Sequence, residues 1–194
     1  MDNLETIELF VDDLNEDDGV DALSFVEYPA IEENFIALSK HKVEFKTVDT
    51  EKRIIVGLAL VPDKKIYRRK GEEEYNVIFS KDTVRKVAGL YLNRNKTNNT
   101  TLEHAEFTKD VSVVESWIVE SSTQDKTALY GLEAPEGAWA VVMKVNNDEV
   151  WADVKAGKYL GLSIEGMFSG REESEEELSS AELIAQITEL LKDY

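Results

Sequence analysis

The sequence predicts an α+β domain that is rich in strands, and three observations point to this class. Apolar, β-branched runs of strand length recur along the chain, two segments between them have helical spacing, and turn residues separate the runs. Of the 194 residues, 42% are hydrophobic, which is enough for one buried core. The count is six or seven strands with helices around them, an arrangement that can close as a barrel.

The predicted strands lie mostly between Arg53 and Phe168. RIIVGLALVP is apolar and β-branched, and YNVIFS follows it as a second strand. VSVVESWIVESS alternates between apolar and polar residues, as a half-buried strand does. TALYGLE, GAWAVVMKV and LGLSIEGMFS are further strand candidates, and NKTNN is a turn-rich loop that precedes TTLEHAEF.

Two helices are predicted within this core. Ser80 is placed to cap the helix KDTVRKVAGLYLNRN, and an asparagine begins the shorter helix in NNDEVWADVKAGKYL, which Gly157 ends. A glutamate-rich linker, SGREESEEELSS, leads to a third, amphipathic helix from Ala181 to Leu191. The chain therefore divides into an acidic segment (1–45), a core (46–170), and a linker with a C-terminal helix (171–194).

Charge and composition exclude several classes of function. The formal net charge is −18, which disfavours binding to nucleic acid or to anionic membranes. The chain has no cysteine and two histidines, so thiol chemistry is excluded and a zinc site is disfavoured. Its acidic residues leave a carboxylate site for magnesium or calcium open, but no EF-hand-like loop is present. No apolar run reaches bilayer length and the N-terminus is acidic, so we expect no export signal.

Histidine is scarce, so each position is informative. His41 has charged neighbours in SKHKVE, which favours a surface position. His104 lies in TTLEHAEF at a strand end, where a lone histidine is more often a core or boundary residue than a catalytic one. Residue type alone therefore does not make His104 catalytic.

Ser163 lies in KYLGLSIEGMF between two nearby glycines. Glycine lets a substrate backbone approach closely and can free amides to face an oxyanion. The spacing is not that of the GxSxG elbow, and serine among small residues is common in buried strands. On residue types alone, a Ser/His enzyme is one hypothesis among several.

Several segments taken together resemble the phage serine proteases of the XkdF type. They run in order from Gly57 to Phe168: GLALVPDKKIYR, YNVIFSKDTV, LEHAEF, VVESWIV, GAWAVVMKV, VWADVKAGKY and GLSIEGMF. This family is related to phage prohead proteases and, more distantly, to the herpesvirus assemblins. The resemblance implies a β-barrel surrounded by helices, in an enzyme that matures capsids by cleaving scaffold and shell proteins.

The same resemblance assigns the two main site residues. The family's histidine falls on His104 and its serine on Ser163. Ser163 would attack a peptide carbonyl while His104 takes its proton and later passes it to the leaving amine. Backbone amides near the strand end, or in the loop before Gly137, are the candidate oxyanion donors. No metal and no organic cofactor is implied.

The third member of the site is open. In related enzymes a later strand carries it. Here VDALSFVEYPA in the acidic segment looks like that strand, so the resemblance implies a barrel strand at residues 20–30, as in a circular permutation. The alignment places Ala22 at the acid's position and Asp21 one residue away, where a one-residue slip reverses the face. Glu115 is the rival, because a buried carboxylate on its strand would need a partner such as His104. A dyad without an acid and an exposed Glu115 are the plain alternatives.

The resemblance implies a prohead maturation endopeptidase that acts in the host cytoplasm, inside the assembling procapsid. Its partners would be scaffold and major capsid precursor proteins, with its own extensions as further substrates. Assemblin relatives suggest a homodimer, and neither nucleic acid nor membrane is expected as a partner. The alternative is a catalytically silent protein of the same fold with a structural or scaffold-binding role.

Two further features are predicted at the surface. One basic cluster forms a surface hairpin or docks acidic scaffold, and its members are Lys64, Lys65, Arg68, Arg69 and Lys70. The C-terminal helix either packs on the core or binds scaffold or portal. The three tryptophans are expected to be core anchors.

Overall fold

The computed structural model describes residues 4–12, 14–27, 46–49 and 52–172. Within these ranges it contains twelve strands and three α-helices, which confirms the α+β, β-rich class. The strand count exceeds the predicted six or seven, because several short strands in charged segments carry no apolar pattern. Residues 169–172, predicted as the start of the glutamate-rich linker, form a strand instead. The rest of this linker, the helix predicted at 181–191, and His41 lie outside the described residues.

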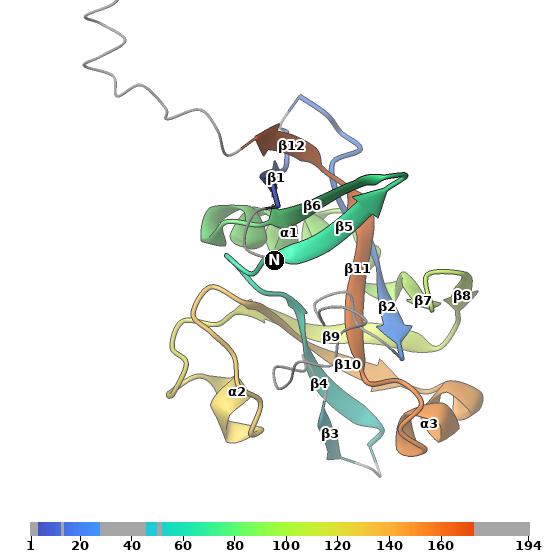
Figure 1. Ribbon diagram of the computed structural model, residues 1–194. Helices are drawn as coiled ribbons and strands as arrows, with labels where there is room; N and C mark the ends of the chain where they lie inside the picture. Colours follow the sequence, from blue (N-terminus) through green and yellow to red (C-terminus); the bar gives the residue numbers. More distant parts are fainter. Residues whose placement is uncertain (1–3, 13, 28–45, 50–51, 173–194) are drawn as a thin grey trace, which may run out of the picture.

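Three four-stranded sheets make up the domain (Figure 1). The first sheet has the order β12 (Ser169–Glu172), β1 (Thr6–Phe10), β6 (Glu73–Ile78), β5 (Ile66–Lys70). The second sheet has the order β3 (Lys46–Asp49), β4 (Ile54–Leu60), β10 (Trp139–Val145), β9 (Val111–Ile118). The third sheet has the order β11 (Gly161–Met167), β2 (Gly19–Val26), β7 (Thr100–Leu102), β8 (Glu106–Thr108). None of the described sheets closes on itself, so the expected barrel is not confirmed.

The strand predicted at residues 20–30 forms β2 and lies beside the serine-bearing strand. β2 pairs antiparallel with β11 and parallel with β7. The predicted strand is confirmed, whereas the permuted order that the resemblance suggests stays a prediction.

Both predicted core helices form, and their caps are the predicted ones. Ser80 caps α1 (Lys81–Asn93) by accepting a hydrogen bond from the backbone N–H of Thr83. Asn147 caps α3 (Asp148–Lys155) in the same way, with two backbone N–H donors. Gly157 follows α3 with φ of 73°, the left-handed conformation that ends many helices.

The strand prediction for TALYGLE is wrong, because its first residues form the short helix α2 (Lys126–Leu129). Asp125 Oδ1 accepts hydrogen bonds from the backbone N–H of Thr127 at 2.9 Å and from Trp117 Nε1 at 2.9 Å. An aspartate that caps a turn in this way satisfies backbone donors locally, which competes with a strand ladder.

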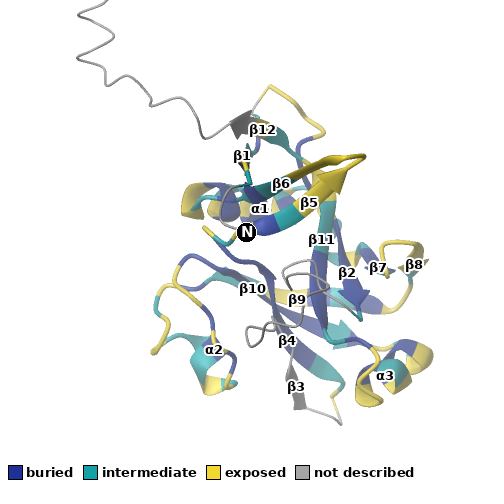
Figure 2. Cartoon of the chain, in the orientation of Figure 1, coloured by how far each residue is buried: buried dark blue, intermediate teal, exposed yellow. Residues whose placement is uncertain are grey.

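The core lies between the second and third sheets and α1. Buried residues concentrate on β4, β10, β2 and β11, whereas the outer end of the β5–β6 hairpin is exposed (Figure 2). Tyr91 of α1 packs edge-on against Trp139 of β10, with ring centroids 5.2 Å apart. Trp139 and Trp151 are buried as expected, and Trp117 is partly buried against the core.

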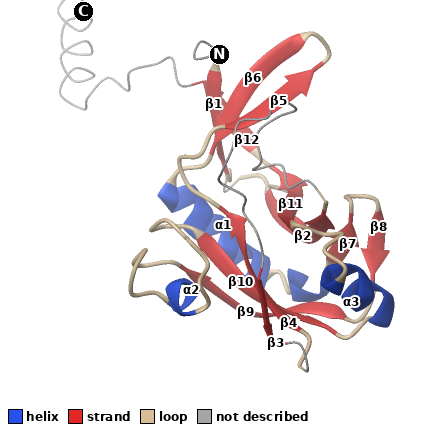
Figure 3. Cartoon of the chain, turned by 60° about the horizontal axis from the view of Figure 1, so that its bottom comes forward, coloured by secondary structure: helices blue, strands red, loops and turns tan. Residues whose placement is uncertain are grey.

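Three members of the basic cluster, Arg68, Arg69 and Lys70, lie on a surface hairpin, and Lys64 and Lys65 precede it. Docking of acidic scaffold by this cluster stays a prediction. β5 and β6 pair antiparallel through the turn at Gly71, which has φ of 66°. The hairpin extends away from α1 and the second sheet (Figure 3). None of the described helices has the length and apolar character that crossing a bilayer requires.

Candidate functional site

Three hydroxyl side chains form a row across the third sheet. Ser163 of β11 is the register partner of Ser24 on β2, and Ser24 is the partner of Thr101 on β7. Register partners share a face of the sheet, so all three hydroxyls lie on one side. Ser163 is 5% exposed, Ser24 is fully buried and Thr101 is 2% exposed. Sheet pairing therefore places two distant segments of the chain, β2 and β7, in one row with Ser163.

His104 follows this row in the turn after β7. Its backbone N–H donates a hydrogen bond to Ser24 Oγ at 3.0 Å. Glu103 and His104 have φ of 50° and 56°, a left-handed conformation that is uncommon outside glycine. Such a conformation costs on the order of 1 kcal/mol and persists only where surrounding contacts maintain it. The turn holds the histidine next to Ser24, on the serine side of the sheet.

Glu165 completes the cluster. It lies two residues after Ser163 on β11, and residues two apart on a strand share a face. Its Oε1 atom is 3.2 Å from His104 Nδ1, and Thr101 Oγ1 donates a hydrogen bond to the same oxygen. The His104 side chain is 42% exposed and that of Glu165 is 27% exposed. The sequence analysis missed Glu165, although its two-residue spacing from Ser163 was a usable signal.

The two predicted third members lie elsewhere. Glu115 is on β9 of the second sheet and forms an ion pair with Lys126. Asp21 is exposed on β2, where its carboxylate is 3.0 Å from Lys96 Nζ. Among the described residues, neither makes an ion pair or hydrogen bond with His104. Ala22, the position that the alignment gives to the acid, is the register partner of Glu165.

The two ring nitrogens of His104 have different surroundings. Nδ1 faces the Glu165 carboxylate, which leaves Nε2 as the nitrogen that can accept a proton from a serine hydroxyl. Within the described part of the chain, Ser163 Oγ makes no hydrogen bond to this ring. Catalytic hydrogen bonds are often long without substrate and tighten when it binds.

Two amides at the end of the loop before Gly137, one of the two predicted oxyanion segments, are already hydrogen-bonded. The N–H of Gly137 donates to the carbonyl oxygen of Val119 at 2.8 Å, and that of Ala138 donates to Pro135 at 3.2 Å. The amides of the Ser163 strand remain the other candidates.

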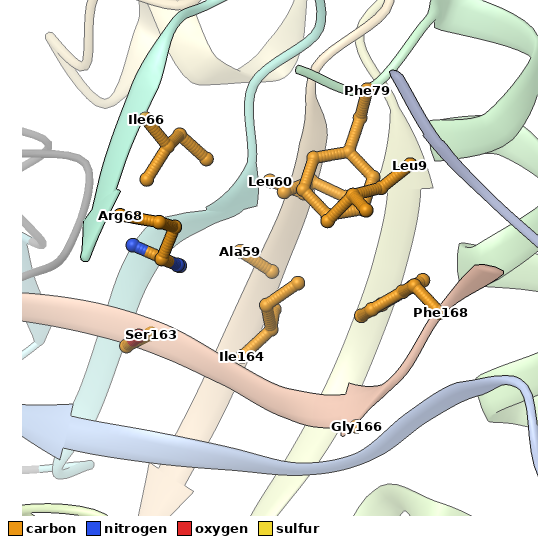
Figure 4. Close-up of a pocket in the computed structure, with 10 residues that line it drawn as sticks. All are labelled: Leu9, Ala59, Leu60, Ile66, Arg68, Phe79, Ser163, Ile164, Gly166 and Phe168. Atoms are coloured by element: carbon orange, nitrogen blue, oxygen red, sulfur yellow. The ribbon is translucent and has the colours of Figure 1, made fainter. Parts of the chain in front are cut away.

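A cavity of about 240 Å³ lies beside Ser163 (Figure 4). Its walls come from β1, β4, β5, β11 and the residues after β6 and β11, and its lining residues are Leu9, Ala59, Leu60, Ile66, Arg68, Phe79, Ser163, Ile164, Gly166 and Phe168. No group of three or more histidines or carboxylates among the described residues is arranged to hold a metal ion.

Comparison with known families identifies the chain. The family described as "Putative phage serine protease XkdF" matches residues 42–172, more than half of the chain. The chain belongs to this family. The resemblance read from the sequence is thereby confirmed. No curated protein and no solved structure matches the chain.

The XkdF match covers only part of the site. His104, Ser163 and Glu165 all lie within residues 42–172. β2 lies before this range, yet it supplies Ser24 and joins the serine strand to the histidine turn. The XkdF-type region of this chain thus depends on an N-terminal strand to assemble the cluster.

Proposed function

We propose that the chain is a serine endopeptidase that uses Ser163, His104 and Glu165. The observation that carries the proposal is the placement of these residues on one side of the third sheet, within the XkdF-type region. A serine, a histidine and a carboxylate at one ring nitrogen of that histidine are the groups that serine peptidases use to hydrolyse peptide bonds.

Each residue has a separate role in the proposed mechanism. Ser163 Oγ attacks the peptide carbonyl while His104 Nε2 takes its proton. The Nδ1–H donates to Glu165, which orients the ring and stabilises the imidazolium that forms. His104 then protonates the leaving amine, and water attacks the acyl-enzyme with the same histidine as base. Thr101 keeps the carboxylate in place by donating to it.

The proposed setting is phage head assembly. The substrates are scaffold and major capsid precursor proteins, with the chain's own extensions as further candidates. Cleavage would occur inside the assembling procapsid, in the host cytoplasm, without metal or organic cofactor. A homodimer is the proposed oligomeric state, by analogy with assemblins. The support for this setting is membership of a family named for phage serine proteases.

The first test is intact-mass spectrometry of the purified chain, alone and mixed with its scaffold and capsid precursors. Wild type is compared over time with Ser163→Ala and His104→Ala, and a fluorophosphonate probe reports on nucleophile reactivity. We expect discrete fragments and labelling at Ser163 in wild type, with rates reduced at least about a thousandfold in both variants. Fragments that persist in Ser163→Ala would contradict the assignment of the nucleophile.

The second candidate function is a catalytically silent protein of the same fold that binds scaffold. Two observations favour it: Ser163 is 5% exposed, and no hydrogen bond within the described residues joins its hydroxyl to His104. A folded wild-type chain that binds scaffold but neither labels nor cleaves would establish this reading over the protease.

A further inference from the structure

The cavity between the first sheet and β11 is mostly apolar. Seven of its ten lining residues are aliphatic or aromatic. Phe79 and Phe168 form one wall, with ring centroids 5.0 Å apart in an edge-to-face arrangement. Ile66 and Ile164 extend into the cavity from β5 and β11 (Figure 4). Such a lining favours an apolar group over a polar one.

The cavity is small and faces away from the Glu165 carboxylate. Its volume is about 240 Å³, below the roughly 300–1,000 Å³ of typical small-molecule sites, so it suits one or two side chains. Ser163 borders the cavity, but Ile164 points into it, and neighbouring residues of a strand point to opposite faces. An occupant of the cavity is therefore not a peptide that is held at Ser163 for cleavage.

Arg68 is the charged residue in the lining. Its side chain extends from β5 into the cavity, and Nη1 donates to the carbonyl oxygen of Tyr67 at 3.0 Å (Figure 4). Its register partner on β6 is Tyr75, whereas each of the next two cations on β5 lies opposite a glutamate. No carboxylate of the described residues forms an ion pair with this guanidinium. An occupant that carries a carboxylate beside an apolar group would match both parts of the cavity.

The last described strand ends in the same sheet and is directed toward the level of Arg68. Glu172 at the end of β12 is paired with Ile7 of β1. Ile7 is paired with Val77 of β6, which is paired with Ile66 of β5. Glu172 and Ile66 therefore lie in one row across the sheet. Because β12 and β5 run in the same direction, the end of β12 points toward the level of Arg68, two residues beyond Ile66.

The sequence after β12 supplies the matching chemistry. Residues 173–177 are ESEEE, and Leu178 follows Glu177 directly. Neighbouring strands lie about 4.8 Å apart, so β5, three positions from β12 in the sheet, is about 14 Å away. Five residues can span about 16 Å when extended. This length allows Leu178 to reach the cavity while Glu177 reaches Arg68.

We propose that the chain's own acidic segment docks here, with Leu178 in the cavity and Glu177 paired with Arg68. The contact holds the residues that follow β12 against the first sheet and covers the apolar lining. The inference goes beyond the proposed protease function and does not rest on it, because neither His104 nor Glu165 takes part.

The chain has no cysteine, so introduced cysteine pairs can report on this contact in the full chain. A disulfide requires Cα atoms about 4.4–6.8 Å apart. Leu178→Cys is combined with Ile66→Cys in the cavity or, as a control, with Tyr67→Cys, the next residue of β5, which faces the other side of the hairpin. Intact mass follows disulfide formation in a glutathione redox buffer, and thermal unfolding shows that each reduced variant is folded.

We expect the Ile66→Cys pair to form its disulfide at least about tenfold faster than the Tyr67→Cys pair. A tethered segment that does not dock would reach both positions at a similar effective concentration, in the millimolar range. Leu9→Cys, which lines the cavity from β1, provides a second pair with Leu178→Cys and replaces Ile66→Cys if that variant does not fold. This pair should also form its disulfide faster than the control.

Arg68→Gln tests the ion pair, and Arg69→Gln is its matched control. Arg69 is the next residue on β5, its Nε atom donates to the carbonyl oxygen of Gly71 at 3.0 Å, and it does not line the cavity. Added to the Ile66→Cys pair, Arg68→Gln should slow disulfide formation about twofold to fivefold, the range for an ion pair near the surface. Arg69→Gln should leave the rate unchanged.

Three outcomes would contradict the inference. Equal rates for the Ile66→Cys and Tyr67→Cys pairs would overturn the docking. Disulfide-linked dimers in place of a bond within one chain would also overturn it and assign the cavity to the acidic segment of a second copy. An equal effect of Arg68→Gln and Arg69→Gln would overturn the pairing with Glu177. The protease function is tested separately, by labelling of Ser163.

Discussion

His104 is held at two points by neighbours from the third sheet. Its backbone N–H donates to Ser24 Oγ, and its Nδ1 lies 3.2 Å from Glu165 Oε1. Thr101 donates to the same carboxylate oxygen, which orients it before any substrate arrives. In the proposed mechanism, a histidine fixed by its backbone and by Nδ1 would present Nε2 as the proton acceptor. Ser24, Thr101 and Glu165 would then be positioning residues.

Glu165→Gln tests this role. The amide cannot stabilise an imidazolium and can favour the wrong tautomer, so kcat should fall by about a hundredfold to ten-thousandfold with little change in KM. Steady-state kinetics on one cleaved peptide measure the effect. The controls are Glu115→Gln and Asp21→Asn, which should stay close to wild type because their partners are Lys126 and Lys96. A fall in kcat in Glu115→Gln or Asp21→Asn, with none in Glu165→Gln, would make the affected residue the third member of the site.

At the scale of elements, the pairing of β11 with β2 determines how Ser163 and Glu165 are oriented. The register shifts between Glu165 and Gly166, which marks a bulge directly after the site. A Cβ atom on Gly166 would lie 1.9 Å from the carbonyl oxygen of Gly19, a distance that no side chain can tolerate. Only glycine lets the two backbones approach this closely, so Gly166 maintains the pairing that orients Ser163 and Glu165.

Gly166→Ala should therefore destabilise the fold by about 1–3 kcal/mol, as overpacking of a close contact does. Gly89→Ala is the matched control, because no neighbouring atom lies within 4 Å of a Cβ at that helical position. The control should stabilise the chain by about 0.5–1 kcal/mol, the helix preference for alanine over glycine. Urea unfolding of both variants gives the two free energies. The same change in unfolding free energy in Gly166→Ala and Gly89→Ala would show that the bulge does not need glycine.

At the scale of the whole molecule, Asp18 connects the first and third sheets. It is 1% exposed, and its Oδ2 accepts hydrogen bonds from the Asp12 N–H at 2.9 Å and from Ser169 Oγ at 2.8 Å. Its Oδ1 accepts from Asn15 Nδ2 at 2.7 Å. Asp12 and Asn15 lie in the β1–β2 connection, whereas Ser169 begins β12, so one carboxylate joins the two ends of the described chain.

Acid should weaken this connection. Burial by itself raises the pKa of Asp18, but hydrogen bonds from Asp12 and Ser169, with the charge of Arg94, lower it below its ordinary value. A carboxylate whose folded pKa is lowered stabilises the fold fully above its unfolded pKa of about 3.9. That contribution is lost as pH falls from about 3.9 through the folded pKa.

Asp18→Asn should lower the free energy of unfolding at pH 7 by about 2 kcal/mol, because the new amide donors face existing donors. The difference in free energy of unfolding between wild type and variant should become smaller below about pH 4. Urea unfolding at several pH values, followed by tryptophan fluorescence, measures it. Asp17→Asn, an exposed neighbour, should show no such gap. A free-energy difference that stays constant with pH would mean that the charge of Asp18 does not contribute to stability.

The sequence by itself determined the features that depend on neighbouring residues. Ser80 and Asn147 cap their helices through atoms two or three residues away, and the apolar runs of β4, β10 and β11 form strands as predicted. TALYGLE failed because Asp125 also binds Trp117, a contact that the segment's own pattern does not contain. The resemblance supplied His104 and Ser163, because those motifs are intact in the chain.

Only the tertiary structure decided which carboxylate meets His104. Thr101 and Glu165 are 64 positions apart, and their hydrogen bond runs across β2, which pairs with both of their strands. The small side chain of Ala22 faces Glu165 across that pairing, while Asp21 is exposed at the register shift, where it has no partner position on β11. A cap depends on local geometry, whereas a strand's register depends on the whole sheet, so residue spacing could name Glu165 as a candidate without selecting it.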